Sequence, residues 1–121
     1  MQYLVQMRLA GSGRPGNEQD GAVFIERFIF PTLEKCKELQ AEGKILAGGP
    51  VSSAVALALI VNANSAPELD DLVTSLPIWP RMETTVTPLT TFDDRMQSLR
   101  PRLAQLKAER RGDSAESWET S

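Results

Sequence analysis

Residues 55–63 read VALALIVNA, a run in which Asn62 is the one polar residue. Its valines, leucines and isoleucine favour a β-strand, in which successive side chains point to opposite faces of the sheet. The two faces hold Val55, Leu57, Leu59 and Val61 on one side and Ala56, Ala58 and Ile60 on the other. Neither face is polar, so both must be covered, by helices on one side and by a second layer on the other.

Three further stretches have strand character. Residues 45–51 are apolar and are separated from residues 55–63 by Ser52, Ser53 and Ala54, which predicts an antiparallel hairpin. Residues 2–9 alternate, with Tyr3, Val5, Met7 and Leu9 on one side. Residues 82–89 are β-branched and alternating, and form the predicted fourth strand.

Two segments have helical periodicity. Between Asp20 and Glu42, apolar residues recur at steps of three and four, and Gly43 is placed to end the helix. Pro31 lacks a backbone N–H, so we expect a kink or a break near Phe30. Residues 65–68 form a capping box at the start of a second, shorter helix, which Pro77 ends.

The resulting order, βαββαβ, predicts an α+β domain of ferredoxin-like topology, with a four-stranded antiparallel sheet and both helices on one face. The opposite face is left bare, and a second copy's sheet is the natural cover, so we expect a homodimer. We assign residues 1–90 to this domain, 91–111 to a C-terminal helical arm packed on a neighbouring subunit, and 112–121 to a disordered tail. Pro101 should break the arm or start its helix near Ser98.

Composition removes several classes of function. The 121 residues carry a net charge of −3, which gives no general attraction to nucleic acid or to an anionic membrane. The start of the chain lacks the pattern of a signal peptide, and we expect a soluble cytoplasmic protein. The absence of histidine and the single Cys36 exclude metal sites, Ser-His-Asp chemistry and an internal disulfide.

Two motifs are weak. Gly11, Gly13 and Gly16 match G-x-G-x-x-G, but Pro15 removes an amide, the helix starts late and no acidic residue follows at the required distance, so a flexible loop is favoured over a dinucleotide site. The basic residues of the last helix lack interleaved aromatics and are interpreted as a solvated face.

Cys36 lies in the apolar stripe of the first helix and is interpreted as a core residue.

A carboxylate is the most plausible base in a chain without histidine. Glu26 borders the apolar stripe of the first helix, where it could reach a cavity between helix and sheet, although a solvated surface glutamate is the general expectation. The candidates for substrate binding are Tyr3, Arg8, Arg27, Gly48, Gly49 and Trp79. The two glycines permit close approach by a ligand or by another backbone, and Trp79 suits a pocket wall or an interface equally.

Residues 65–89, SAPELDDLVTSLPIWPRMETTVTPL, resemble the closing part of muconolactone isomerases, through Leu76-Pro77-Ile78-Trp79-Pro80 and the following Met82. LQAEG, residues 39–43, also fits the end of that family's first helix, and the resemblance covers roughly residues 1–90. It implies a dimeric α/β barrel and a cofactor-free proton shift on an unsaturated lactone carboxylate in aromatic catabolism. Aligned on LQAEG, the family's helix acid falls near Thr32. Where the family carries a histidine with bulky aromatics on its second strand, this chain reads Ile45-Leu46-Ala47-Gly48-Gly49-Pro50.

The leading hypothesis is therefore an isomerase-like enzyme that needs no cofactor and acts on a small unsaturated lactone or acid, with Glu26 as base and Arg8 or Arg27 near the carboxylate. The alternative is a non-catalytic dimeric barrel that binds a small apolar metabolite or serves as an accessory protein. A third reading is a cofactor-independent monooxygenase-type barrel.

Overall fold

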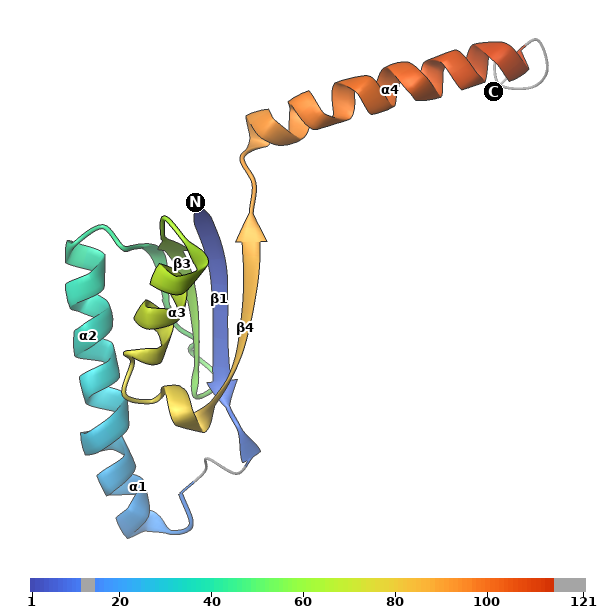
Figure 1. The fold of residues 1–121 in the computed structure, drawn as a ribbon. Coiled ribbons are helices and arrows are strands. Elements are labelled where there is room, and N and C mark those ends of the chain that lie inside the picture. The colour runs from blue at the N-terminus through green and yellow to red at the C-terminus, as the bar shows by residue number, and fades with distance from the viewer. Residues whose placement is uncertain (12–14, 115–121) are drawn as a thin grey trace. The chain divides into compact units, whose positions relative to one another are not determined.

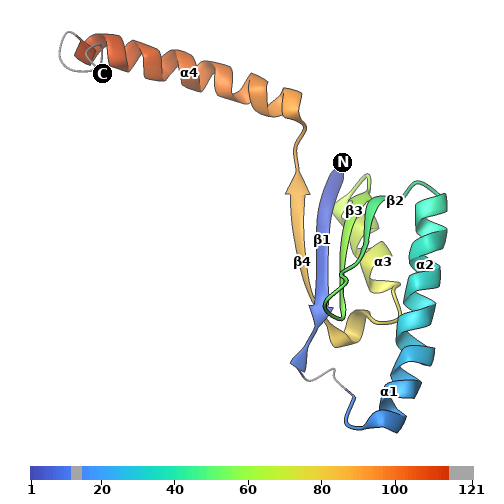
Figure 2. The ribbon, with the colours of Figure 1, turned by 180° about the vertical axis from the view of Figure 1, so that it is seen from behind.

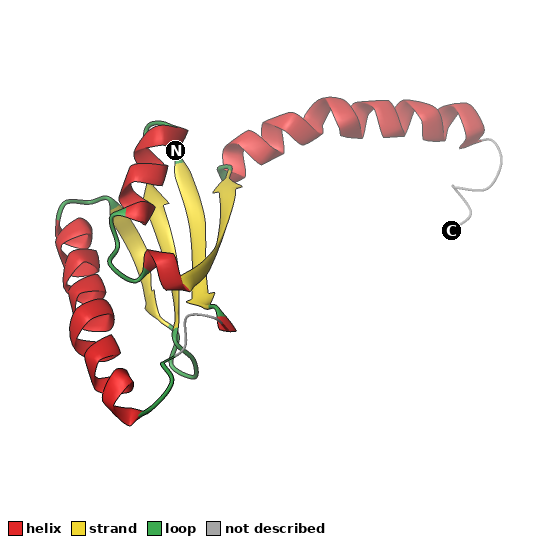
Figure 3. Ribbon diagram, turned by 60° about the horizontal axis from the view of Figure 1, so that its bottom comes forward, coloured by secondary structure: helices red, strands yellow, loops and turns green. Residues whose placement is uncertain are grey.

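The structure is a computed structural model, and it describes residues 1–11 and 15–114. Contacts divide it into two compact units, Met1–Leu89 and Thr90–Ser121. The first unit contains a four-stranded sheet in the order β2-β3-β1-β4, and its helices lie on one face of that sheet (Figures 1 and 3). This is the predicted α+β, ferredoxin-like arrangement, and the fold prediction is confirmed.

Strands β1 (Gln2–Leu9) and β3 (Ala56–Asn62) occupy the centre of the sheet. They are antiparallel, with Val5 opposite Leu59, and β4 (Met82–Leu89) pairs with the other side of β1. The predicted alternation is observed: the helix-covered face buries Tyr3, Val5, Met7, Leu57, Leu59 and Val61. The opposite face has no covering element among residues 1–11 and 15–89.

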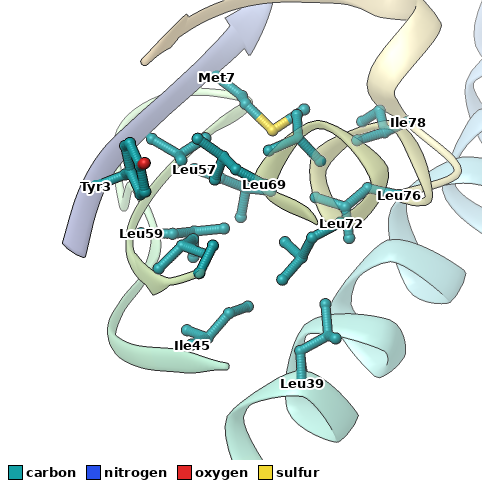
Figure 4. Packing of buried hydrophobic residues seen from close by; sticks show 14 of the residues in the cluster. Tyr3, Met7, Leu39, Ile45, Leu57, Leu59, Leu69, Leu72, Leu76 and Ile78 are labelled. Atoms are coloured by element: carbon teal, nitrogen blue, oxygen red, sulfur yellow. The ribbon is translucent and has the colours of Figure 1, made fainter. Parts of the chain in front are cut away.

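The core lies between this sheet and the helices. Figure 4 shows Met7, Leu57 and Leu59 of the sheet directed toward Leu69 and Leu72 of helix α3 (Ala66–Thr74). Burying a side chain of this size contributes roughly 1.5–3 kcal/mol relative to leaving it in water. The covered face of the sheet is therefore the main source of stability of the first unit.

The first long helix is continuous but irregular. It consists of α1 (Glu18–Phe24), a π-helical turn η2 (Ile25–Ile29) and α2 (Phe30–Ala41). Within the π turn the Phe30 N–H donates to the carbonyl oxygen of Ile25. A kink or a break was expected near Phe30, and the structure has a widened turn there and no break. The wider turn accommodates the ring of Pro31 and its missing N–H.

Capping residues fix the helix starts. Asn17 accepts a hydrogen bond from the Asp20 N–H at 2.8 Å, which begins α1. At α3 (Ala66–Thr74) the Ser65 hydroxyl oxygen accepts from the Glu68 N–H at 3.2 Å. The Glu68 carboxylate in turn accepts from the Asn64 N–H at 2.9 Å, so the predicted capping box is present, with the return bond one residue further out.

The edge strand β2 (Ile45–Pro50) is irregular and nearly bare of side chains. Its register with β3 shifts between Ile45 and Ala47, and Gly48 has a φ of 110°. A Cβ atom on Gly48 would lie 2.8 Å from the Leu59 Cα and closer still to the Ala58 carbonyl oxygen. Close approach to β3 therefore explains why residue 48 is a glycine.

In the second unit, α4 runs from Phe92 to Ser114 and Figure 2 shows it as one uninterrupted ribbon. The break expected at Pro101 is therefore wrong: the proline lies inside the helix. The helix also continues to Ser114, past the start of the tail predicted at residue 112. The rest of that tail, with Trp118, lies outside the described residues, as does Gly13 of the glycine motif.

We predict that Gly48→Ala destabilises the protein by about 3 kcal/mol or more, because it adds a steric clash to an unfavourable φ. Gly49→Ala is the matched control, since nothing lies within 4 Å of its added Cβ. Urea denaturation of both variants measures the difference. Equal midpoints for the two variants would show that the Gly48 backbone is not constrained as described.

Candidate active site

A small apolar cavity lies between the first helix and the β2–β3 hairpin. Its volume is about 170 Å³, and its walls come from the helix, the hairpin and the segment before β4. An engineered apolar cavity of about 150 Å³ binds benzene, so this space admits one small ring. The lining residues are Ile29, Thr32, Leu33, Pro50, Ala54, Val55, Ala56, Leu57, Ile78 and Met82.

Thr32 contributes the one polar side chain among the described residues that line this cavity. It is 2% exposed, and its hydroxyl oxygen accepts a hydrogen bond from the backbone N–H of Ile78 at 3.0 Å. This bond ties α2 to the segment that leads into β4. It also leaves the hydroxyl proton available to a ligand, because the hydroxyl acts as an acceptor toward Ile78.

A second cavity, of about 270 Å³, adjoins the first and shares Leu33, Pro50 and Leu57 with it. Gly48 and Gly49, which were predicted to let a ligand or another backbone approach closely, line this second cavity. Gly48 is also required by its close packing against β3. Lys37, Gln40 and Cys36 extend it along α2, with Ile45 and Leu59 completing its wall.

The Cys36 side chain is half-buried in this second cavity. Desolvation by burial raises the pKa of its thiol above the usual value. A thiol of raised pKa is protonated near neutral pH and is a poor nucleophile. Cys36 packs against the hydrophobic core, in agreement with its interpretation as a core residue.

The predicted base, Glu26, lies on the π turn η2 and is exposed, as is its neighbour Arg27. Neither residue lines the cavity in the described part of the protomer. Glu26 is, however, on the same π turn as Ile29, which does line it. The low-dielectric surroundings expected for the Glu26 carboxylate are therefore not present in the single protomer.

Arg8 is on the opposite, uncovered face of the sheet, where its Nε donates to the Glu83 carboxylate at 3.1 Å. Both side chains are largely exposed, so this ion pair contributes at most about 1 kcal/mol. Two broader hollows on this side include Arg8 and Glu83. Arg8 and Glu26 are thus on different sides of the sheet, and the described structure does not bring them into one site.

Tyr3 is buried in the core, and its hydroxyl donates to the sulfur of Met1 at 3.4 Å. Trp79 begins the 3-10 turn η3 (Trp79–Arg81) and is partly exposed. Neither lines the 170 Å³ cavity or the 270 Å³ cavity. Of the seven predicted site residues, Gly48 and Gly49 line the 270 Å³ cavity, and none lines the 170 Å³ cavity.

Arg81 is a candidate that the sequence analysis missed. It lies on η3 between Ile78 and Met82, which both line the 170 Å³ cavity. Its guanidinium carbon stands 4.4 Å from the centroid of the Phe28 ring and 5.5 Å from that of Phe24. This cation–π stack holds a positive charge at the end of α1 that faces η3. A basic residue after a Pro-bounded turn carries no sequence signal for such a position.

Thr32 is the second residue the sequence analysis did not select for binding, although the family alignment pointed to its position. Its polar character inside an apolar helical stripe was the available signal. Among the described residues, no group of three or more His, Cys, Asp or Glu side chains is arranged to hold a metal ion. No helix in residues 1–11 and 15–114 is long and apolar enough to cross a membrane.

The sheet order and the one-sided helical layer define a ferredoxin-like α+β domain. Residues 1–95 match the family model described as muconolactone delta-isomerase. The chain therefore belongs to the muconolactone delta-isomerase family, a family of isomerase-like enzymes. The predicted family resemblance is confirmed.

Two solved structures share the fold. A muconolactone isomerase is 22% identical, with a TM-score of 0.62, and the match covers 75% of this chain and 90% of that one. The 5-chloro-2-hydroxyhydroquinone dehydrochlorinase of Burkholderia phenoliruptrix AC1100, in complex with 2,5-dihydroxybenzoquinone, is 24% identical, with a TM-score of 0.57, over 78% of this chain and 98% of that one. No curated protein matches the chain.

We predict that Thr32→Val destabilises the protein by about 1–3 kcal/mol, because it leaves the buried Ile78 N–H without an acceptor. Thr32→Ser, which keeps the hydroxyl and removes a methyl group, should cost about 1 kcal/mol. Thermal unfolding of the two variants separates the contribution of the hydrogen bond from that of the methyl group. If the serine variant is the less stable of the two, the hydrogen bond is not what makes Thr32 important.

Proposed function

We propose that the chain catalyses a cofactor-free proton shift on a small unsaturated lactone or carboxylic acid that binds in the 170 Å³ cavity. The observation that carries the proposal is the family match over residues 1–95, which include every residue of the cavity wall. The size and apolar lining of the cavity suit a single small ring.

In this proposal a base removes a proton from one ring carbon, exchanges that proton with the solvent, and delivers a proton to another carbon of the same molecule, so in H₂O the product has the formula of the substrate. Glu26 is the proposed base, because its π turn ends at the cavity residue Ile29. In this proposal the Thr32 hydroxyl, which accepts from the Ile78 N–H, donates its own proton to the substrate oxygen on which negative charge develops.

Arg81 is the proposed partner of the substrate carboxylate. It adjoins two cavity residues, and its stack on Phe28 restricts its side chain. Arg8 is less suited, because it lies on the other face of the sheet. Arg27 is exposed on the π turn and is retained as a second candidate.

We also propose that two copies pair through the uncovered sheet face. Supporting this, Leu4, Ala58 and Ile60 lie on that face with only their own sheet around them. Two such sheets packed face to face remove these apolar side chains from water.

A second candidate function is non-catalytic binding of a small apolar metabolite. It is favoured by one observation, that no ionisable side chain is among the described residues lining the 170 Å³ cavity. The two functions differ in one measurable respect. A binding protein is stabilised by its ligand and leaves it unchanged, whereas an isomerase exchanges a carbon-bound proton with its base.

The test follows muconolactone by NMR in D₂O with the intact protein. We expect deuterium incorporation and a shifted double bond, with Glu26→Gln reducing the rate by about 100-fold or more. Glu34→Gln, an exposed glutamate on the same helix, is the matched control and should retain the wild-type rate.

Equal rates for Glu26→Gln and wild type would remove Glu26 as the base while leaving the activity itself in place. Thermal stabilisation by the lactone without any exchange would replace the isomerase proposal with the binding function. In either case Leu33→Phe, which narrows both cavities, should weaken the effect of the ligand if the cavity is where it binds.

A further inference from the structure

Helix α4 carries an apolar stripe that the described structure leaves uncovered. Its large apolar residues are spaced by four, three, four and three positions, and all are between 44% and 93% exposed. They are Phe92, Met96, Leu99, Leu103 and Leu106. Charged residues flank this stripe on both sides, so it is narrow, as in a coiled-coil seam and unlike the broad face of a core helix.

The spacing assigns a heptad register. Met96 and Leu103 fall at a positions, and Phe92, Leu99 and Leu106 at d positions. Pro101 falls at an f position, on the outer side of the helix, where its missing N–H and its ring do not disturb the seam. Pro101 therefore lies at the position where it interferes least with a partner helix.

The flanking charges distinguish the two possible directions of pairing. The e positions are Asp93, Arg100 and Lys107, and the g positions are Arg95, Arg102 and Glu109. A parallel pair of α4 helices brings g against e of the next heptad. That arrangement sets Arg95 against Arg100 and Arg102 against Lys107, so every such pair within the seam is repulsive.

An antiparallel pair brings e against e and g against g. With Leu99 of one helix opposite Leu103 of the other, Asp93 faces Lys107 and Arg95 faces Glu109, and each pair occurs twice by symmetry. The repulsive contacts are reduced to Arg100 and Arg102 against their own copies at the two-fold axis. The charge pattern therefore favours the antiparallel direction.

We propose that α4 is a self-association element, which pairs antiparallel with α4 of a second copy of this chain through the Phe92–Leu106 stripe. A seam of this length is marginally stable for free helices. The sheet-face pairing proposed above would strengthen it, because each helix would then be attached to a domain that associates, which raises the effective concentration of its partner. This inference does not depend on the catalytic proposal.

Disulfide cross-linking of the full chain tests the pairing, in a Cys36→Ser background so that only the introduced thiols react. Antiparallel pairing places Met96 opposite Leu106 of the other copy. We expect the double variant Met96→Cys/Leu106→Cys to cross-link to a covalent dimer, and each single variant to remain uncrosslinked under the same oxidation.

The alternatives give different outcomes. Parallel pairing cross-links each single variant to its own copy, and this result would overturn the proposal. If α4 packs on something other than a second α4, neither the single nor the double variants cross-link, and the proposal is again wrong. The two cysteines of one chain are too far apart along a helix to react with each other, since ten residues span about 15 Å.

A charge exchange gives an independent test in the double-cysteine protein. Lys107→Asp should lower the cross-linked fraction at limiting oxidation time, on the order of tenfold, because it turns an attractive pair into a repulsive one. Adding Asp93→Lys should restore it. In a parallel pair Lys107→Asp would face Arg102 and increase cross-linking, so an increase contradicts the antiparallel arrangement.

Discussion

The structure depends on one constraint, the two-sided apolar character of β3. Leu57, Leu59 and Val61 are 6% exposed or less on the covered face, and each such side chain contributes roughly 1.5–3 kcal/mol on burial. The same strand presents Ala58 and Ile60 to the other face, where residues 1–11 and 15–89 offer no cover. The covered side of β3 thus contributes to the core of one protomer, and its other side belongs to the face through which we propose that two copies pair.

The position of the cavity follows from the strand next to β3. Gly48 approaches β3 closely, and Gly48 and Gly49 of this edge strand, which have no side chains, line the second cavity. The two volumes are lined mostly by aliphatic groups, with the Thr32 hydroxyl in the first and Lys37 and Gln40 in the second as polar elements. A site of this kind selects ligands by size and by a small number of polar contacts.

The sequence predicted the fold well because it is a matter of periodicity: strand alternation, capping residues and the Gly43 helix end are local signals that tertiary packing supports. It indicates the cavity lining less directly, because that lining depends on which side of a helix faces a gap. Glu26 borders the apolar stripe in sequence but is exposed, whereas Arg81 reaches its position through a 3-10 turn that no periodicity describes. Pro101 was misjudged for a related reason, since an outward-facing proline can be tolerated within a long helix.

The π turn at Ile25–Ile29 has a consequence for comparing this chain with its relatives. A turn of this type inserts one residue into the helical repeat, which rotates everything before it by about 100° relative to everything after it. An alignment anchored on LQAEG therefore pairs equivalent residues back to Phe30. Before the π turn, it is displaced by one position relative to any helix that lacks such a turn. Equivalent side chains in the first helix of a relative without this insertion must be found by superposing helical axes, because a letter-by-letter alignment would pair residues that point in different directions.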